Sequence, residues 1–204
     1  MPFNIADFRA AVYGRGIARP SKFLVRVFSP PGMIGDFDDV VRDIEMWAEA
    51  TELPIFGLHT GEHPRYGYGP DEKRVVRAIY QDVRIKLIAD ESMAHWRFFK
   101  EWLNLIVESN MSGGIGGTGG AAMPYEINYK SEYLTSVNIQ TFDEAGHLRA
   151  SVVLRDAFPI ALEAVELAWA NGEEYMRIPV TMCFTDWYEE PPEEGGAPAN
   201  GFES

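Results

Sequence analysis

Two stretches of the sequence contain residue types whose spacing could support chemistry, and the first is a pair of histidines beside a glutamate. Residues 59–63 read HTGEH and match the H-x-x-E-H pattern of some zinc peptidases. That pattern binds zinc when both histidines project from one face of a helix and converge on one metal. Here a glycine interrupts the pattern and a proline follows it at once, which favours a loop. We therefore interpret the histidines as solvated loop residues, and a zinc hydrolase using His59, Glu62 and His63 is an alternative.

The second stretch is a run of glycines at residues 113–120. Residues 114–119 match G-x-G-x-x-G, the fingerprint in which backbone amides at a helix N-terminus bind a pyrophosphate. That fingerprint acts between a strand and a helix, whereas this run follows a predicted helix and precedes predicted strands. We therefore interpret it as a flexible connector. The sequence contains no serine nucleophile elbow, P-loop or cysteine cluster, so we expect no catalytic residue, no bound cofactor and no metal site.

Composition narrows the class of protein further. The chain has 204 residues, of which 46% are hydrophobic and 13% aromatic, and this suits one globular domain. A net charge of −13 disfavours a nucleic-acid-binding surface, although it suits a surface that DNA must pass without binding. No apolar run approaches the roughly 18 residues of a membrane span, and the N-terminus does not resemble a secretion signal. The single cysteine, Cys183, fits a reducing compartment.

Most of the elements that position these stretches are predicted to be strands. Their β-branched and aromatic residues alternate with polar ones between glycine and proline breakers. The predicted strands are residues 22–28, 73–80, 82–89, 125–130, 133–142, 148–154, 159–169 and 173–185. Alternation predicts a buried face for residues 83, 85 and 87, and another for residues 176, 178, 180, 182 and 184.

One helix is predicted at about residues 91–108. Asp90 or Ser92 can cap its N-terminus, and Glu91 suits the positive end of the helix dipole. Its apolar residues recur at spacings of three and four, which predicts a buried stripe of Trp96, Phe99, Trp102, Leu103 and Ile106.

Two segments before this helix are harder to assign. Residues 42–52 alternate like a strand, although a helix is also compatible with them. Residues 54–71 are rich in glycine, proline and aromatic residues, which predicts a long loop. Because Phe56, Tyr66 and Tyr68 would be costly to leave in water, we expect a partner to order this loop.

Together these patterns predict a mainly β protein, an antiparallel β-sandwich or barrel with one flanking α-helix. We expect an N-terminal arm at residues 1–20 and the β domain at residues 21–188. An acidic tail at residues 189–204 is expected to be disordered, since it is too poor in apolar residues to fold.

Several stretches, in the same order, resemble the tail tube proteins of contractile-tailed bacteriophages. They are residues 43–54, 66–70, 88–90, 97–102, 125–130, 141–146, 156–160 and 184–187. The resemblance covers roughly residues 20–188 and implies the phage tail tube fold. The glycine run and the acidic tail depart from the family.

The resemblance also implies a function. Members form hexameric rings whose strands close one large inner β-barrel, and the rings stack into a tube inside a contractile sheath. Implied partners are further copies of the chain, sheath proteins and baseplate or neck proteins, with transient passage of DNA and no membrane. The implied location is the virion tail, after assembly in the host cytoplasm. Two alternatives stay open: a ring that initiates or terminates the tube at the baseplate or neck, and a tube of a bacteriocin or secretion system.

Two groups of residues are candidates for these roles. Asp43, Glu45 and Glu49 share one face if their segment is a strand, and they are candidates for lining the lumen. An ordinary solvated outer face is the other interpretation. Phe56, Tyr66 and Tyr68 of the long loop, with the N-terminal arm, are candidates for contact between rings. Packing on their own domain is the other interpretation.

Overall fold

The computed structural model of the chain describes residues 5, 9, 20–35, 37–64, 67, 69–107, 126–165 and 175–191. Several predictions lie outside these residues. They concern most of the N-terminal arm, the glycine run, Tyr66, Tyr68 and the acidic tail from residue 192 onward.

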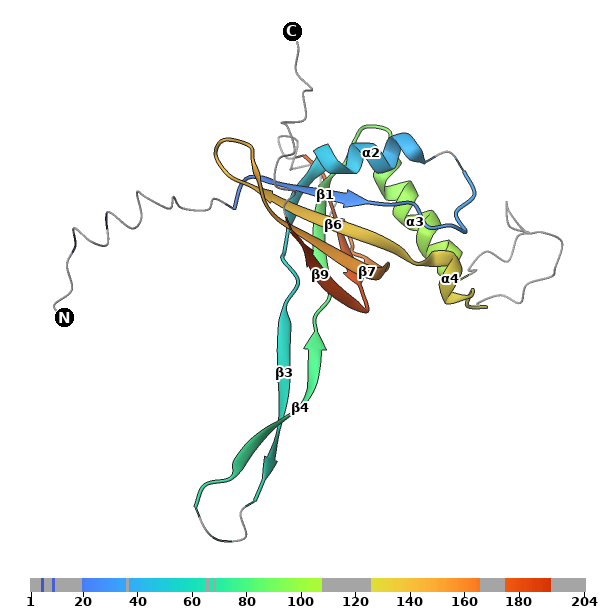
Figure 1. The fold of residues 1–204 in the computed structure, drawn as a ribbon. Helices are drawn as coiled ribbons and strands as arrows, with labels where there is room; N and C mark the ends of the chain where they lie inside the picture. The colour runs from blue at the N-terminus through green and yellow to red at the C-terminus, as the bar shows by residue number, and fades with distance from the viewer. Residues whose placement is uncertain are drawn as a thin grey trace.

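An antiparallel sheet of seven strands forms the body of the protein (Figure 1). Six strands follow the order β1-β6-β7-β8-β5-β2, and β9 also pairs with β7. The bounds are β1 Phe23–Val27, β2 Ala48–Thr51, β5 Val83–Ile88, β6 Thr135–Phe142, β7 Leu148–Leu162, β8 Arg177–Cys183 and β9 Asp186–Glu190. The mainly antiparallel β fold expected from the sequence is confirmed, and the sheet remains open rather than closing into a barrel.

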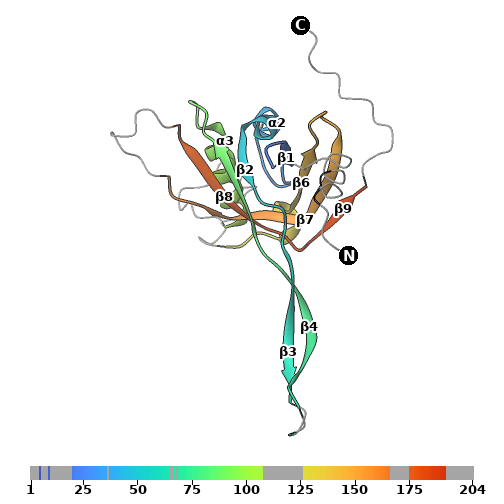
Figure 2. The same cartoon turned by 90° about the vertical axis from the view of Figure 1, so that its left-hand side faces the viewer.

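Strand β7 joins the two halves of this sheet. Its first part pairs with β6 and β9, and its last part, from Phe158, pairs with β8. Between them Asp156 has a φ of 53°, a left-handed conformation that few non-glycine residues adopt. The change of partner at this irregularity bends the sheet, as Figure 2 shows. The strand predicted at 148–154 and the first part of the one predicted at 159–169, as far as Leu162, are therefore one bent strand.

Helix α3, Ala94–Ile106, confirms the predicted helix and covers the sheet beside α2, Asp38–Trp47. Asp90 Oδ1 accepts a hydrogen bond from the Ala94 amide at 2.9 Å, so Asp90 does satisfy an N-terminal amide. The buried face differs in part from the predicted stripe. It consists of His95, Phe98, Phe99 and Trp102, whereas Trp96, Leu103 and Ile106 are only half-buried.

The structure decides one open assignment and contradicts one prediction. Residues 42–47 belong to helix α2, and the strand β2 begins only at Ala48. Residues 126–129 form no strand beyond one bridge between Ile127 and Val107, and a short helix α4, Lys130–Tyr133, follows them. In both places the alternation is short and has only a few buried residues, so the packing partners decide the structure.

The core lies between the sheet and the two longer helices. Val83, Ile85 and Leu87 of β5 are buried as predicted, and so are Ile178, Val180, Met182 and Phe184 around β8. Trp102 stacks on Phe99, and its indole Nε1 donates a hydrogen bond to the Tyr133 carbonyl at 2.9 Å. No helix among the described residues is long and apolar enough to cross a membrane.

Strands β3, Phe56–His63, and β4, Glu72–Tyr80, form a separate two-stranded sheet. This hairpin, here called the arm, projects from the body in both views (Figures 1 and 2). The loop predicted at residues 54–71 is therefore wrong for residues 56–63, which form strand β3.

Candidate functional site

The arm presents apolar side chains to solvent. Phe56 pairs with Tyr80, and Leu58 pairs with Ala78. Alternate residues of a strand point the same way, so these two pairs share one face, here called the apolar face. Phe56 and Leu58 are each 54% exposed. Further exposed apolar residues on the arm are Val75 and Val76. A two-stranded hairpin with no packed face is marginal in water, which indicates that the arm has a partner.

The opposite face of the arm carries polar and charged groups together with Ile79, which pairs with Gly57. His59 pairs with Arg77, and Gly61 pairs with Arg74, so these residues lie opposite the apolar face. Arg74 Nε lies 3.2 Å from Glu72 Oε1. Arg77 has no ion pair within the described part of the chain. We call the face that holds His59, Arg74 and Arg77 the cationic face.

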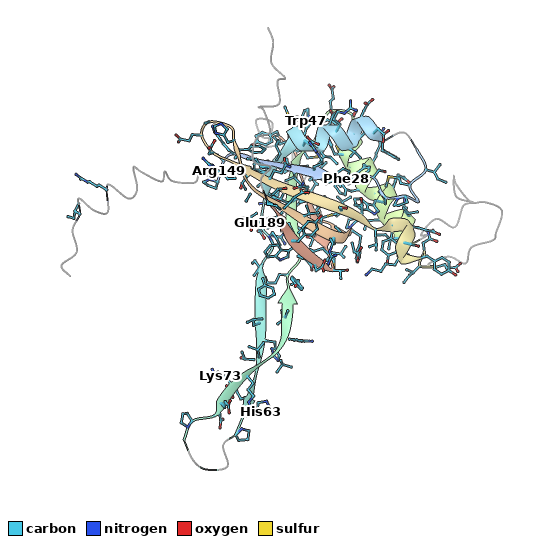
Figure 3. The ribbon with its side chains drawn as sticks, in the orientation of Figure 1. Phe28, Trp47, His63, Lys73, Arg149 and Glu189 are labelled. Carbon is cyan, nitrogen blue, oxygen red and sulfur yellow. The ribbon has the colours of Figure 1, made fainter. Side chains whose placement is uncertain are left out.

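The H-x-x-E-H pattern lies on the arm and does not form the geometry that zinc needs. His59 and His63 are exposed on strand β3 rather than in a loop, and Figure 3 shows His63 towards the end of the arm. Residues four apart on a strand are separated by about 13 Å, too far to share one metal. Glu62 instead lies 3.9 Å from Lys73 Nζ. Within the described residues, no three potential ligands are grouped around a possible metal position.

The arm is inserted in the chain between β2 and β5, which are neighbours in the sheet. The end of the arm next to the body is here called its root. Thr51 at the end of β2 pairs with Ile85 of β5, so the two strands would form a simple hairpin without the arm. At the root Tyr80 lies against Phe184 of the body, with ring centroids 6.1 Å apart. The sequence pattern predicts β4 but not β3, because the glycines of β3 suggest a loop. One signal for β3 was available in the sequence: residues 56–63 precede a predicted strand of similar length, as the first strand of a hairpin does.

In the described part of the chain, the sheet ends in strands that have a neighbour on one side only. Strands β1 and β2 stand at the two ends of the strand order, and β9 pairs only with β7 in the described part of the chain. Arg155 anchors β9 by donating from Nε to Asp186 Oδ1 at 2.6 Å, and this bond lowers the pKa of Asp186. Such edges carry free backbone donors and acceptors that can pair with another chain.

The three acidic candidates do not share a strand face, so the reason for grouping them is wrong. Asp43 and Glu45 lie on helix α2, and only Glu49 lies on a strand, β2. Glu45 Oε1 accepts a hydrogen bond from Arg26 Nε at 2.5 Å. Glu49 accepts bonds from Arg177 and Tyr175, and the bond from Arg177 contributes most to lowering its pKa. Two of the three charges are therefore balanced within the subunit.

Comparisons with known proteins agree with this geometry. The phage tail tube protein family matches residues 18–190. No curated protein matches the sequence. Among solved structures, a chain of the anti-feeding prophage baseplate has a TM-score of 0.60 at 10% identity, over 87% of this chain and 98% of that chain.

Two further structures share the fold. A chain of the PVC sheath-tube complex, from an extracellular contractile injection system in the extended state, has a TM-score of 0.57. It is 12% identical and covers 93% of this chain and 99% of that chain. A chain of the anti-feeding prophage tube terminating cap has a TM-score of 0.56 at 14% identity, over 86% of this chain and 92% of that chain. At these identities the likeness concerns the fold alone.

Proposed function

Because the chain belongs to the phage tail tube protein family, we propose that it is a structural subunit of a tube built from stacked hexameric rings within a contractile sheath. The observation that carries this proposal is the arm, a hairpin that projects from the body and leaves Phe56, Leu58, Val75 and Val76 more than half exposed. A subunit with such an arm gains stability only when another chain covers it.

The open sheet edges support lateral contacts within a ring. If strands at the ends of the sheet pair with those of neighbouring subunits, six open sheets close into one barrel and no edge stays exposed. The arm is then free to make the contacts between rings. In this proposal Phe56, together with Tyr66 and Tyr68 from the segment between β3 and β4, belongs to the ring-to-ring contact.

The proposal that DNA passes through the channel rests on the net charge of the chain, −13. An acidic wall does not hold phosphate groups, which bind where cationic side chains replace their counterions. The three acidic candidates for lining the lumen contribute unequally to its negative charge. Arg26 pairs with Glu45 and Arg177 pairs with Glu49, which leaves Asp43. The proposed location is the tail or tube of the assembled particle.

A second candidate is a ring that starts or ends the tube at its baseplate or neck. It is favoured by structural likeness to chains of a baseplate and of a tube terminating cap. Such a protein would form one ring without polymerising. A tube of a bacteriocin or of an extracellular injection system would have the same subunit fold and would differ in its cargo.

Negative-stain microscopy of the purified protein tests these proposals. We expect tubes with an open channel, alone or after addition of a baseplate seed; single rings would favour the second candidate. A strictly monomeric protein at high concentration, with and without the seed, would overturn both. A variant with residues 57–79 replaced by Asn-Gly joins Phe56 to Tyr80 through a two-residue turn. It should fold and form at most rings.

A further inference from the structure

The arm differs in charge from the rest of the chain. Residues 56–80 contain four lysines or arginines and three aspartates or glutamates. The whole chain contains 18 lysines or arginines and 31 aspartates or glutamates. The arm segment therefore carries a net charge of +1 and the remainder −14. The negatively charged bodies of stacked subunits repel one another, and a projecting segment of positive charge offsets that repulsion.

Helix α2 presents the surface that matches the arm. Asp38, Asp39 and Asp43 are exposed on it, and none of the three has an ion pair within the described part of the chain. At the end of the same helix Met46 is 75% exposed and Trp47 37% exposed. This surface, here called the α2 face, thus combines three aspartates and apolar side chains with one exposed cation, Arg42, so that its exposed charge is negative on balance. The arm in turn combines cationic and apolar side chains.

The arm and the α2 face lie at opposite ends of the subunit. In Figures 1 and 2, which differ by a quarter turn about the vertical, the arm extends downward and α2 lies at the top. Figure 3 places the labelled Trp47 and Lys73 at these two ends. Two different surfaces at opposite ends form a head-to-tail contact, which repeats without closing and so generates a filament.

We propose that the arm of one subunit docks on the α2 face of a subunit in the next ring. Arg77 on the cationic face approaches Asp39 and Asp43, and Ile79, which lies on the same face of the arm, covers Met46 and Trp47. The strands of the arm, eight and nine residues long, reach about 25 Å from the root, whereas Arg77 lies three residues from Tyr80, about 10 Å along the arm. The α2 face therefore meets the half of the arm next to the root. This inference rests on the proposed stacking of rings and names the surface that receives the arm.

Charge reversal with rescue tests the proposal, with sedimentation of tubes as the readout and microscopy as confirmation. Arg77→Glu should raise the protein concentration needed for tube growth by about tenfold at low salt. Combining it with Asp43→Arg should return that concentration to within about threefold of the unmodified chain. Arg97→Glu is the matched control, because Arg97 is exposed on α3 away from the arm and has no ion pair in the described part of the chain. It should change tube growth little.

Each other outcome overturns the proposal. If Arg77→Glu behaves like Arg97→Glu while tubes still form, the arm does not dock through its cationic face, and the proposed function stands. If Arg77→Glu weakens growth but Asp43→Arg and Asp39→Arg both fail to rescue it, the receiving surface is not the α2 face. If no variant and no seed produces rings or tubes, this inference and the proposed function fail together.

Discussion

Arg177 on β8 donates a hydrogen bond from Nε to Glu49 Oε2 on β2, across the intervening strand β5, at 2.7 Å. Tyr175 donates to the other carboxylate oxygen at 2.7 Å, and its ring lies under the Arg177 guanidinium, 4.2 Å from centroid to carbon. Strand β2 is an end strand, and the chain continues from it into the arm. This cluster therefore fixes the strand from which the arm extends.

Replacing Glu49→Gln should lower the free energy of unfolding at neutral pH by about 0.5–1 kcal/mol. The folded protein lowers the pKa of Glu49, so the stabilisation is present above the ordinary carboxylate pKa and is lost as the pH falls through the lowered value. Urea titrations from pH 7 to pH 3 should show the two proteins converging. Glu101→Gln, on an exposed residue of α3, is the control. A difference that stays constant down to pH 3 would contradict this explanation.

Asp143 organises the turn between β6 and β7. Its Oδ1 accepts bonds from the Ala145 and His147 amides at 2.9 Å, and its Oδ2 accepts one from Arg149. The His147 amide contributes most to lowering the pKa of Asp143 to about 2. The carboxylate therefore stabilises the fold above about pH 4, and this contribution falls away towards pH 2. Asp143→Ala should lower the thermal midpoint at pH 7 and much less at pH 2.5, measured by circular dichroism.

Trp102→Phe should destabilise the body by about 1–3 kcal/mol, because it leaves the buried Tyr133 carbonyl without its donor. Trp96→Phe is the matched change on the half-buried side of the same helix, where Lys100 lies over the indole ring. It should cost less than about 1 kcal/mol. Urea unfolding monitored by circular dichroism compares the two variants, and equal losses would refute the assigned role of the Trp102 bond.

Gly32→Ala should cost about 1–3 kcal/mol, because an added Cβ would lie 2.9 Å from the Glu132 carbonyl oxygen. The Gly32 amide also donates to that oxygen at 2.8 Å, so the two segments cannot separate without losing the bond. Gly57→Ala provides the comparison, since its nearest contact would be 3.8 Å. Thermal unfolding should show a lower midpoint for the first variant and little change for the second.

Leu58→Asn should leave the unfolding free energy of the monomer within about 0.5 kcal/mol of the unmodified chain, because Leu58 is exposed on the arm. It should still reduce tube growth, since it places a polar group within the proposed contact between rings. Sedimentation and urea unfolding of the same preparation measure the two effects. A loss of monomer stability with normal tube growth would assign Leu58 to its own domain.

Periodicity alone was sufficient where one face of an element is buried. The alternation in β5 and β8 and the helical spacing in α3 predicted these elements because a buried face imposes its period on the residue types. The ordered resemblance to tail tube proteins likewise predicted the family that matches residues 18–190.

The tertiary structure decided the segments in which burial is sparse. Ile44 is the only fully buried residue of α2, so the alternation around it was compatible with strand and helix alike. Strand β3 buries neither face, and its strand conformation depends on pairing with β4. The pairing of Glu49 with Arg177 could not be predicted from the sequence either, because the two residues lie 128 positions apart. Only the folding of β2, β5 and β8 into one sheet brings these side chains within hydrogen-bonding distance.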